Sequence, residues 1–419
     1  MNVNSSALKL RIRKNASSEL LLFLYLTIPV FKAAINIVLR PIGLDDYYWV
    51  FPVGLILLLY FRLCEEKRTI LVPDFWVLYF AVILFFLITY LFHPEYAFWY
   101  ARTDYGVINY ILRPDNGIFL YLFVRLVNDP KKIIKTIKAS AWPIYLLYGA
   151  LVIRAVSRGY WIDTSNRGYE IHLSYNLSLG YEVLTFVLPF IYSALEERKI
   201  IDIIGSFIGI IIILVGGSRG PFLDIGIFVI IYLFIKISNS RRKVILMISA
   251  ITTVILIWIG YPVLVSGLSI ILGKMKLPSR MVTKLASGKI LDDSNRITIW
   301  NAAVEMIKEN PLGYGAMGSR HVISKYVYVA HPHQFFLEVL IDFGVIIGSI
   351  IIIWLGYKTV MLFRMKGQNE WKAVFLIFFA RACQLLISLT FWHSIGLWGA
   401  LAVGVCMNKA GKKGIANGR

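Results

Sequence analysis

Long apolar runs separated by short polar connections make up most of the chain. A helix needs about 20 apolar residues to cross a bilayer, and runs of this kind recur from end to end. Read in order, they predict twelve spans: 19–39, 47–63, 72–92, 106–127, 137–156, 175–195, 199–215, 221–237, 243–272, 334–363, 371–388 and 391–408. The pattern therefore predicts an all-α polytopic membrane protein.

Lysine and arginine gather in every second connection, which is typical of the cytoplasmic side of a membrane protein. The series is the N-terminal tail as far as Lys14, then Lys67-Arg68, Lys131-Lys132, Arg198-Lys199, Arg241-Arg242-Lys243, Arg364 with Lys366, and the tail from Lys409 to Lys413. With twelve spans all of these lie on one side, so we expect both termini in the cytoplasm. No cleavable signal is evident, and we expect the first span to act as a signal anchor.

Two connections on the opposite side are also basic, against the usual bias. One is 154–174, with Arg154, Arg158 and Arg167. The other is 273–333, where nine Lys and Arg face four Asp and Glu. Positive charge on the translocated side indicates an anionic ligand at the outer surface. We expect one membrane domain, 1–419, with 273–333 as an external loop between the ninth and tenth spans.

Composition excludes several other classes of protein. Hydrophobic residues make up 58% of the chain and charged residues only 16%, against about 25% charged in soluble proteins. A soluble enzyme, a disordered chain and a fibrous repeat are therefore excluded, and the long continuous runs do not fit an outer-membrane barrel. The net charge of +20 belongs to the membrane topology, so no nucleic-acid partner is expected. Three cysteines suggest neither a disulfide framework nor a metal cluster.

Within the external loop, 294–310 has the pattern of an amphipathic helix, with an apolar stripe of Ile297, Trp300, Val304 and Ile307. Arg296 falls in its first turn, where a cation opposes the helix dipole. Either Asp292 and Asp293 compensate this charge, or Arg296 binds an anion. The two aspartates are better read as capping residues than as a metal pair, and no metal is expected.

Four further motifs stand out in the second half. In Gly216-Gly217-Ser218-Arg219-Gly220-Pro221, Arg219 either snorkels at the interface or faces an external cavity. In His331-Pro332-His333-Gln334, His333 is either structural or a general base, because a histidine at a helix start beside cations should have a lowered pKa and be neutral. Gly344 and Gly348 are spaced for close helix packing, and Trp392 with His393 suggests an interfacial pair.

Taken together, these motifs resemble a known family. Asn295-Arg296-Ile-Thr-Ile-Trp300, Asn310-Pro-Leu-Gly-Tyr-Gly315, His331-Pro-His333-Gln-Phe-Phe-Leu-Glu-Val-Leu and Asp342-Phe-Gly-Val-Ile-Ile-Gly348 follow the Gly217-Ser218-Arg219-Gly220 turn in order. The set is similar to the O-antigen ligase and Wzy-type polysaccharide polymerase superfamily over roughly 210–350. One departure is Gln334, where the family most often has asparagine.

The resemblance implies a GT-C-like fold and an inverting, metal-independent transfer of glycan from undecaprenyl diphosphate, without a cofactor. By the same resemblance, His333 matches the catalytic histidine, and Arg219 and Arg296 match the arginines that hold the diphosphate. We expect further substrate contacts from other residues on the outer side: Arg154, Arg158, Arg280, Arg320, His331 and Tyr181.

The acceptor decides between two activities. A polymerase extends another lipid-linked repeat unit, whereas a ligase transfers to lipid A-core. The form of the Gly-Ser-Arg-Gly-Pro turn looks more like polymerases of capsule or exopolysaccharide clusters, so we expect a polymerase in a bacterial cytoplasmic membrane, with its site facing outward and a chain-length regulator as a partner. A lipid-linked oligosaccharide flippase is a different class of alternative, but the sequence has no internal repeat of the kind transporters show.

Overall fold

The computed structural model describes most of the chain: residues 16–44, 47–102, 106–164, 170–173, 176–238, 266–267, 269–270, 273–274, 296–325, 331–365 and 367–417. Nearly all of the predicted span 243–272 lies outside these residues. So does the first part of the predicted external loop, with Arg280 and the two aspartates, Asp292 and Asp293, that were expected to cap the helix.

The described residues are almost entirely helical. The longer helices are α1 (Ala16–Leu26), α2 (Ile28–Leu39), α3 (Val50–Lys67), α4 (Pro73–Phe92), α6 (Gly117–Val127), α7 (Pro130–Arg158), α8 (Leu177–Glu197), α9 (Ile200–Gly216), α10 (Gly220–Ser238), α13 (Arg296–Glu309), α15 (Phe335–Arg364), α16 (Asn369–Ala382) and α17 (Ile395–Asn417). Shorter ones are α5 (Ala97–Tyr100), α14 (Gly318–Ile323), the π-helix η4 (Ile108–Leu112), and the 3₁₀-helices η1 (Arg40–Ile42), η3 (Pro94–Tyr96), η5 (Cys383–Leu386) and η6 (Phe391–His393).

Several of these helices have the length and composition of membrane spans. Over the described residues, five are long and apolar enough to cross a bilayer, or six if α1 and α2, which meet at a bend of 61°, form one span. The helices α9 and α17 are also apolar, but their apolar parts, Ile200–Gly216 and Ile395–Gly411, are shorter than those of the candidate spans. An all-α membrane protein is thus confirmed, while the number of twelve spans stays a prediction.

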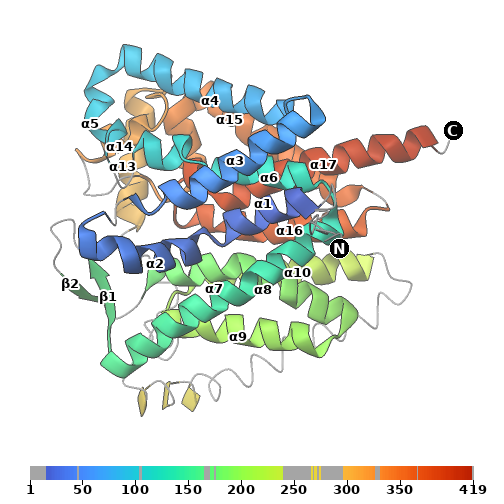
Figure 1. The fold of residues 1–419 in the computed structure, drawn as a ribbon. Coiled ribbons are helices and arrows are strands. Elements are labelled where there is room, and N and C mark those ends of the chain that lie inside the picture. The colour runs from blue at the N-terminus through green and yellow to red at the C-terminus, as the bar shows by residue number, and fades with distance from the viewer. Residues whose placement is uncertain are drawn as a thin grey trace, which may run out of the picture.

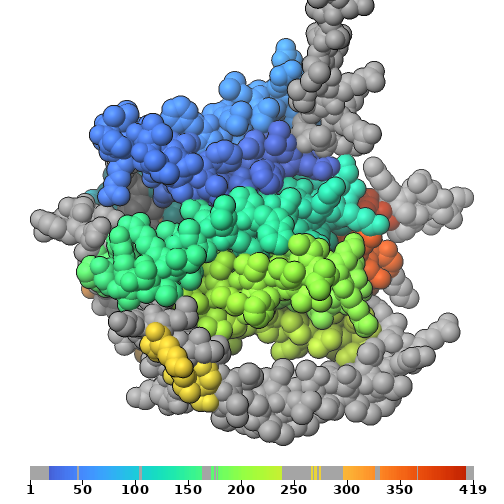
Figure 2. Space-filling view, turned by 60° about the horizontal axis from the view of Figure 1, so that its bottom comes forward, coloured from blue at the N-terminus to red at the C-terminus, as the bar shows by residue number. Residues whose placement is uncertain are grey.

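The helices pack in layers that follow chain order. α8 contacts α7, α9, α10 and α16, and α17 packs between α6 and α16. Figure 2 shows part of this order as bands across one face, from the blue N-terminal helices to the yellow-green helices that end near residue 238. In Figure 1, α1 begins and α17 ends at one end of the bundle, while α5, α13 and α14 lie at the other. We call this second end the loop end.

A small β-hairpin interrupts the helices in the connection 154–174, where the sequence predicted no strand. Strands β1 (Trp161–Thr164) and β2 (Glu170–Leu173) pair antiparallel, with Trp161 opposite Leu173. The Tyr160 and His172 rings stack beside it, 3.8 Å apart. The hairpin also lies at the loop end (Figure 1).

Helix α15 is broken at Gly344, which corrects the prediction that Gly344 and Gly348 serve helix packing. Gly344 has φ +78° and ψ 167°, a conformation essentially confined to glycine. The freed carbonyls of Ile341 and Asp342 accept hydrogen bonds from the Tyr314 and Gly315 amides, at 2.8 and 3.0 Å. A Cβ on Gly344 would lie 2.4 Å from the Leu312 carbonyl oxygen. Gly344 therefore allows the backbone of residues 310–315 to pack into the break in α15.

The helix predicted at 294–310 is present as α13, but its predicted apolar stripe is only partly buried: Trp300 and Ile307 are half-buried, and Ile307 packs against the buried cluster. The buried side chains are Ile299, Ala302, Ala303 and Met306, which pack toward α14 and α15. From the predicted stripe, Ile297 and Val304 are 56% and 38% exposed. Both sets recur at helical spacing, and the small alanines allow the closer approach to α15, so periodicity alone did not decide between the two faces.

Candidate active site

His333 lies in the short segment that leads into α15. The next residue, Gln334, caps this helix, because its side-chain Oε1 accepts a hydrogen bond from the Leu337 amide at 2.6 Å. His333 itself has φ +55°, a conformation that is uncommon outside glycine. Burial first, and the Arg296 guanidinium second, lower the pKa of His333 to about 4. The imidazole is therefore neutral at pH 7, as a general base requires.

His331 lies directly beside His333, with ring centroids 4.2 Å apart. It is buried, and burial, followed by the His333 and Arg320 charges, holds its pKa well below the usual value. Within the described residues neither of its ring nitrogens has a hydrogen-bond partner. Arg320 is also buried, on α14, with its guanidinium 4.7 Å from the centre of the Tyr110 ring.

Arg219 is held in the turn between α9 and α10. Gly217 turns the chain with φ +78°, and the Arg219 carbonyl accepts the first amide bonds of α10, from Phe222 and Leu223. The adjacent Gly220 packs against Tyr181 so closely that a Cβ would lie 1.6 Å from the phenol oxygen. The turn is thus fixed against the first turns of α8, where Tyr181 is buried.

The charges of three arginines, and of Asp224, act on Tyr181. Arg219, Arg296 and Arg381 all lie near enough to act electrostatically on its phenol. They come from the α9–α10 turn, the start of α13 and the last turn of α16. Since Arg296 also acts on His333, the fold brings five of the predicted residues, Arg219, Arg296, Tyr181, His333 and His331, into one cationic site, with Arg320 bordering His331.

Other predicted residues lie elsewhere. Arg154 and Arg158 are exposed in the last turns of α7, next to the β-hairpin. In the part of the chain that the structure describes, no hydrogen bond, ion pair or ring contact joins either of them to the cationic site. Arg280 lies outside the described residues.

Two buried acids beneath the site were not predicted. Glu338 accepts hydrogen bonds from the Thr390 hydroxyl at 2.5 Å and the Phe391 amide at 3.3 Å. Asp342, one turn further along α15, accepts from the Trp392 indole at 2.9 Å and the Met317 amide at 3.3 Å. These bonds tie residues 390–392 to α15 and bury Trp392, which is therefore not the interfacial residue predicted. The sequence did contain a signal for both residues, because acidic side chains within a predicted membrane span are rare and often functional.

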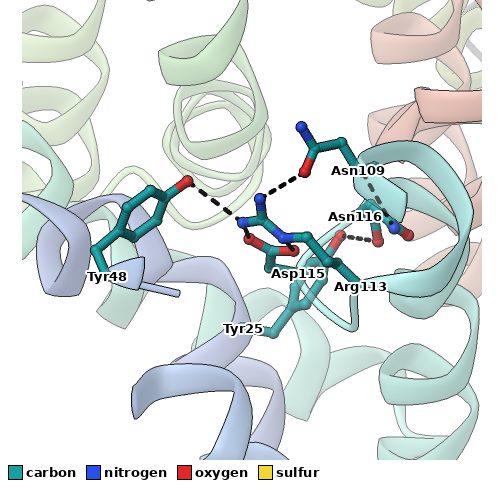
Figure 3. A network of polar contacts seen from close by, with 6 residues as sticks. All are labelled: Tyr25, Tyr48, Asn109, Arg113, Asp115 and Asn116. Atoms are coloured by element: carbon teal, nitrogen blue, oxygen red, sulfur yellow. Dashed lines mark hydrogen bonds and ion pairs between the residues drawn. The ribbon is translucent and has the colours of Figure 1, made fainter. Parts of the chain in front are cut away.

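A second polar network lies next to Arg320, around Tyr110 and Arg113. The Tyr110 ring lies between Arg320 and His393, 4.8 Å from the latter. Tyr110 belongs to the π-helix η4, a rare conformation that is frequent at functional sites. Just after η4, Arg113 pairs with Asp115 and donates to Asn109 and Tyr48 (Figure 3). These contacts hold the chain that presents Tyr110.

Metal ligands are not gathered at this site: among the described residues no group of three or more His, Cys, Asp or Glu side chains has suitable geometry. The chemistry that its side chains offer is binding of an anion by several guanidinium groups and transfer of a proton to a neutral imidazole.

Fold and site together define an α-helical integral membrane protein with a cationic, histidine-containing site at one end of its bundle. Residues 204–353, about a third of the chain, match the model of a family described as O-antigen ligase. The match includes Arg219, Arg296 and His333, and confirms the resemblance to the O-antigen ligase and Wzy-type superfamily. It supports an activity of the O-antigen ligase or polymerase type. No curated protein and no solved structure matches the chain.

Proposed function

We propose that the protein is a polysaccharide polymerase. It transfers glycan from undecaprenyl diphosphate to a hydroxyl group on the terminal sugar of another lipid-linked repeat unit. The observation that carries this proposal is the site itself: Arg296 acts electrostatically on the neutral His333, and both Arg296 and Arg219 act electrostatically on Tyr181. A reaction with a diphosphate leaving group needs an anion-binding group and a base, and this pair of functions is what the side chains offer.

In the proposed reaction His333 takes the proton from the acceptor hydroxyl. The acceptor oxygen then forms a bond to the anomeric carbon of the donor, while the bond from that carbon to the diphosphate oxygen breaks. Undecaprenyl diphosphate leaves with the electron pair, and Arg219 and Arg296 stabilise its charge. A single displacement of this kind inverts the anomeric configuration and needs no metal, because the leaving group is already activated.

The ligase alternative uses the same donor and the same residues, and the description of the matched family favours it. The form of the turn around Arg219 favours the polymerase. Only the acceptor distinguishes the two activities, so the choice between them is a matter for a direct assay.

The proposal includes a topology. We place twelve spans in a bacterial cytoplasmic membrane in a GT-C-like arrangement, with both termini in the cytoplasm and 273–333 outside as a loop of the single membrane domain. The start of α1 and the end of α17 at one end of the bundle support this (Figure 1). Arg154, Arg158 and Arg280 then face the outer side as secondary substrate contacts, and a chain-length regulator is the expected protein partner.

The test uses purified full-length protein in detergent with a synthetic undecaprenyl-diphosphate repeat unit as the only substrate. A polymerase gives a ladder of lengthening glycans, and His333→Ala abolishes it. A suitable control is His93→Ala, since His93 lies at the end of α4 with Glu95 as its partner, and no hydrogen bond, ion pair or ring contact between described residues joins it to His333, Arg296 or Arg219.

The other outcomes assign the alternatives. Transfer that occurs only after lipid A-core is added would identify a ligase. No transfer to either acceptor by the wild-type protein would contradict the proposal and turn attention to the flippase.

A further inference from the structure

Arg381 is a buried cation that neither the motifs nor the proposed reaction uses. It lies in the last turn of α16, a helix that packs against both α8 and α10. It is 5% exposed, and among the described residues its side chain donates one hydrogen bond, to the Gln384 side chain three residues on. The Nε atom has no hydrogen-bond partner, and no carboxylate among the described residues lies within ion-pair distance of it.

A buried charge without an ion pair is costly, because the protein interior does not replace the water that the charge has lost. Asp224 on α10 and Glu182 on α8 act electrostatically on Arg381, but neither forms an ion pair with it among the described residues, and the Asp224 Oδ2 atom has no hydrogen-bond partner there. The C-terminal dipole of α16 and the Tyr181 ring offset part of the cost. Neither supplies the acceptor oxygens that a guanidinium binds.

Arg381 lies close to the residues of the cationic site. Its guanidinium carbon lies 5.4 Å from the centre of the Tyr181 ring. The hydroxyl of the same ring is packed against Gly220, the residue that follows Arg219. One phenol ring therefore separates Arg381 from the turn that carries Arg219, and Arg296 acts on that ring as well.

We propose that Arg381 is a third guanidinium of the site, which binds the diphosphate of the lipid-linked donor together with Arg219 and Arg296. This inference rests on the proposed function and adds a residue from a part of the chain beyond the matched family segment. A diphosphate has two phosphoryl groups and several negative charges, and arginine binds such oxygens through a planar fork that always keeps its charge.

The test compares two lipids that differ by one phosphate. Binding of undecaprenyl diphosphate and of undecaprenyl monophosphate is measured on the purified full-length protein in detergent. We expect Arg381→Gln to bind the diphosphate roughly tenfold to a hundredfold more weakly, the loss of one charge-assisted contact. Its affinity for the monophosphate should fall much less. Arg381→Lys keeps the charge and should recover part of the diphosphate affinity.

The matched control is Lys372→Gln, which removes a second buried cation from the opposite end of the same helix. It should leave both affinities unchanged. Arg219→Gln and Arg296→Gln serve as reference variants for the proposed function itself, and thermal unfolding of each protein shows that it is folded. If Arg381→Gln does not fold, Arg381→Lys carries the comparison, with a smaller but still diphosphate-selective loss expected.

Two results would overturn the inference. Wild-type affinity for both lipids in Arg381→Gln, with weakened binding in Arg219→Gln, would reject Arg381 and leave the proposed function standing. Equal losses for both lipids would assign Arg381 a structural role. If none of the three arginine variants weakened diphosphate binding, the proposed donor site itself would be wrong.

Discussion

Replacing Gly344 with alanine should disconnect the loop that carries Gly313 and Gly315 from α15. A Cβ at this position meets main-chain atoms, the Leu312 carbonyl oxygen at 2.4 Å and its carbon at 2.6 Å. No change of rotamer relieves such a contact. Alanine also does not adopt the glycine conformation, with φ +78° and ψ 167°, that breaks the helix here.

The expected loss of stability has two contributions, backbone strain and lost hydrogen bonds. Backbone strain at such a position costs about 1–3 kcal/mol. Three main-chain hydrogen bonds join the loop to the helix, donated by Tyr314, Gly315 and Val345, and each contributes about 0.5–1.5 kcal/mol. Loss of the whole contact would thus remove roughly 3–7 kcal/mol, a large part of the free energy of unfolding of a typical protein.

Unfolding of the purified protein by increasing SDS, followed by tryptophan fluorescence, measures this change. The matched control is Gly356→Ala, in the same helix, where an added Cβ meets nothing within 4 Å. We expect Gly344→Ala to unfold at a much lower SDS fraction than wild type and Gly356→Ala to unfold near it. Coincident transitions for the two variants would refute the proposed role of Gly344.

Two further predictions concern the site. Because burial and the Arg296 charge hold the pKa of His333 near 4, kcat/KM should fall on the acid side only as pH approaches 4. Removing the cation in Arg296→Gln favours the imidazolium, so in the residual activity this acid limb should move toward pH 6.5; an unmoved limb would rule out the coupling. Gly220→Ala should lower transfer more than tenfold by displacing Tyr181, whereas Gly226→Ala on the same helix, with open space around its Cα, should behave as wild type.

Many helix positions could be predicted from the sequence because apolar runs of membrane length have few other solutions, although the predicted span 106–127 is divided into η4 and α6. The run 334–363, for example, corresponds to α15 at Phe335–Arg364. Breaks within an apolar run were harder to predict. The break at Gly344 depends on a loop about 30 residues upstream that supplies amides to the freed carbonyls. No local pattern distinguishes this glycine from one at a helix-packing surface.

For the candidate site, too, some residues could be predicted from the sequence and others could not. His333, Arg296 and Arg219 were identifiable because each belongs to a motif in a polar connection. Arg381 has no motif, and its signal was only that it is a cation within a predicted apolar span, 371–388. The face of α13 was predicted only in part, because Ile299, Ala302, Ala303 and Met306 recur at the same helical spacing as the predicted stripe.

The cations and the histidine have linked roles in the proposed reaction. A base with a pKa near 4 is a weak acceptor for the proton of a sugar hydroxyl, and part of that weakness comes from Arg296. A bound diphosphate brings negative charge to Arg296 and its neighbours, which opposes their effect on the imidazole. Burial still lowers the pKa, but its electrostatic cause is reduced. In the proposed reaction, donor binding would therefore raise the basicity of His333, and the base would become stronger only when the leaving group is in place.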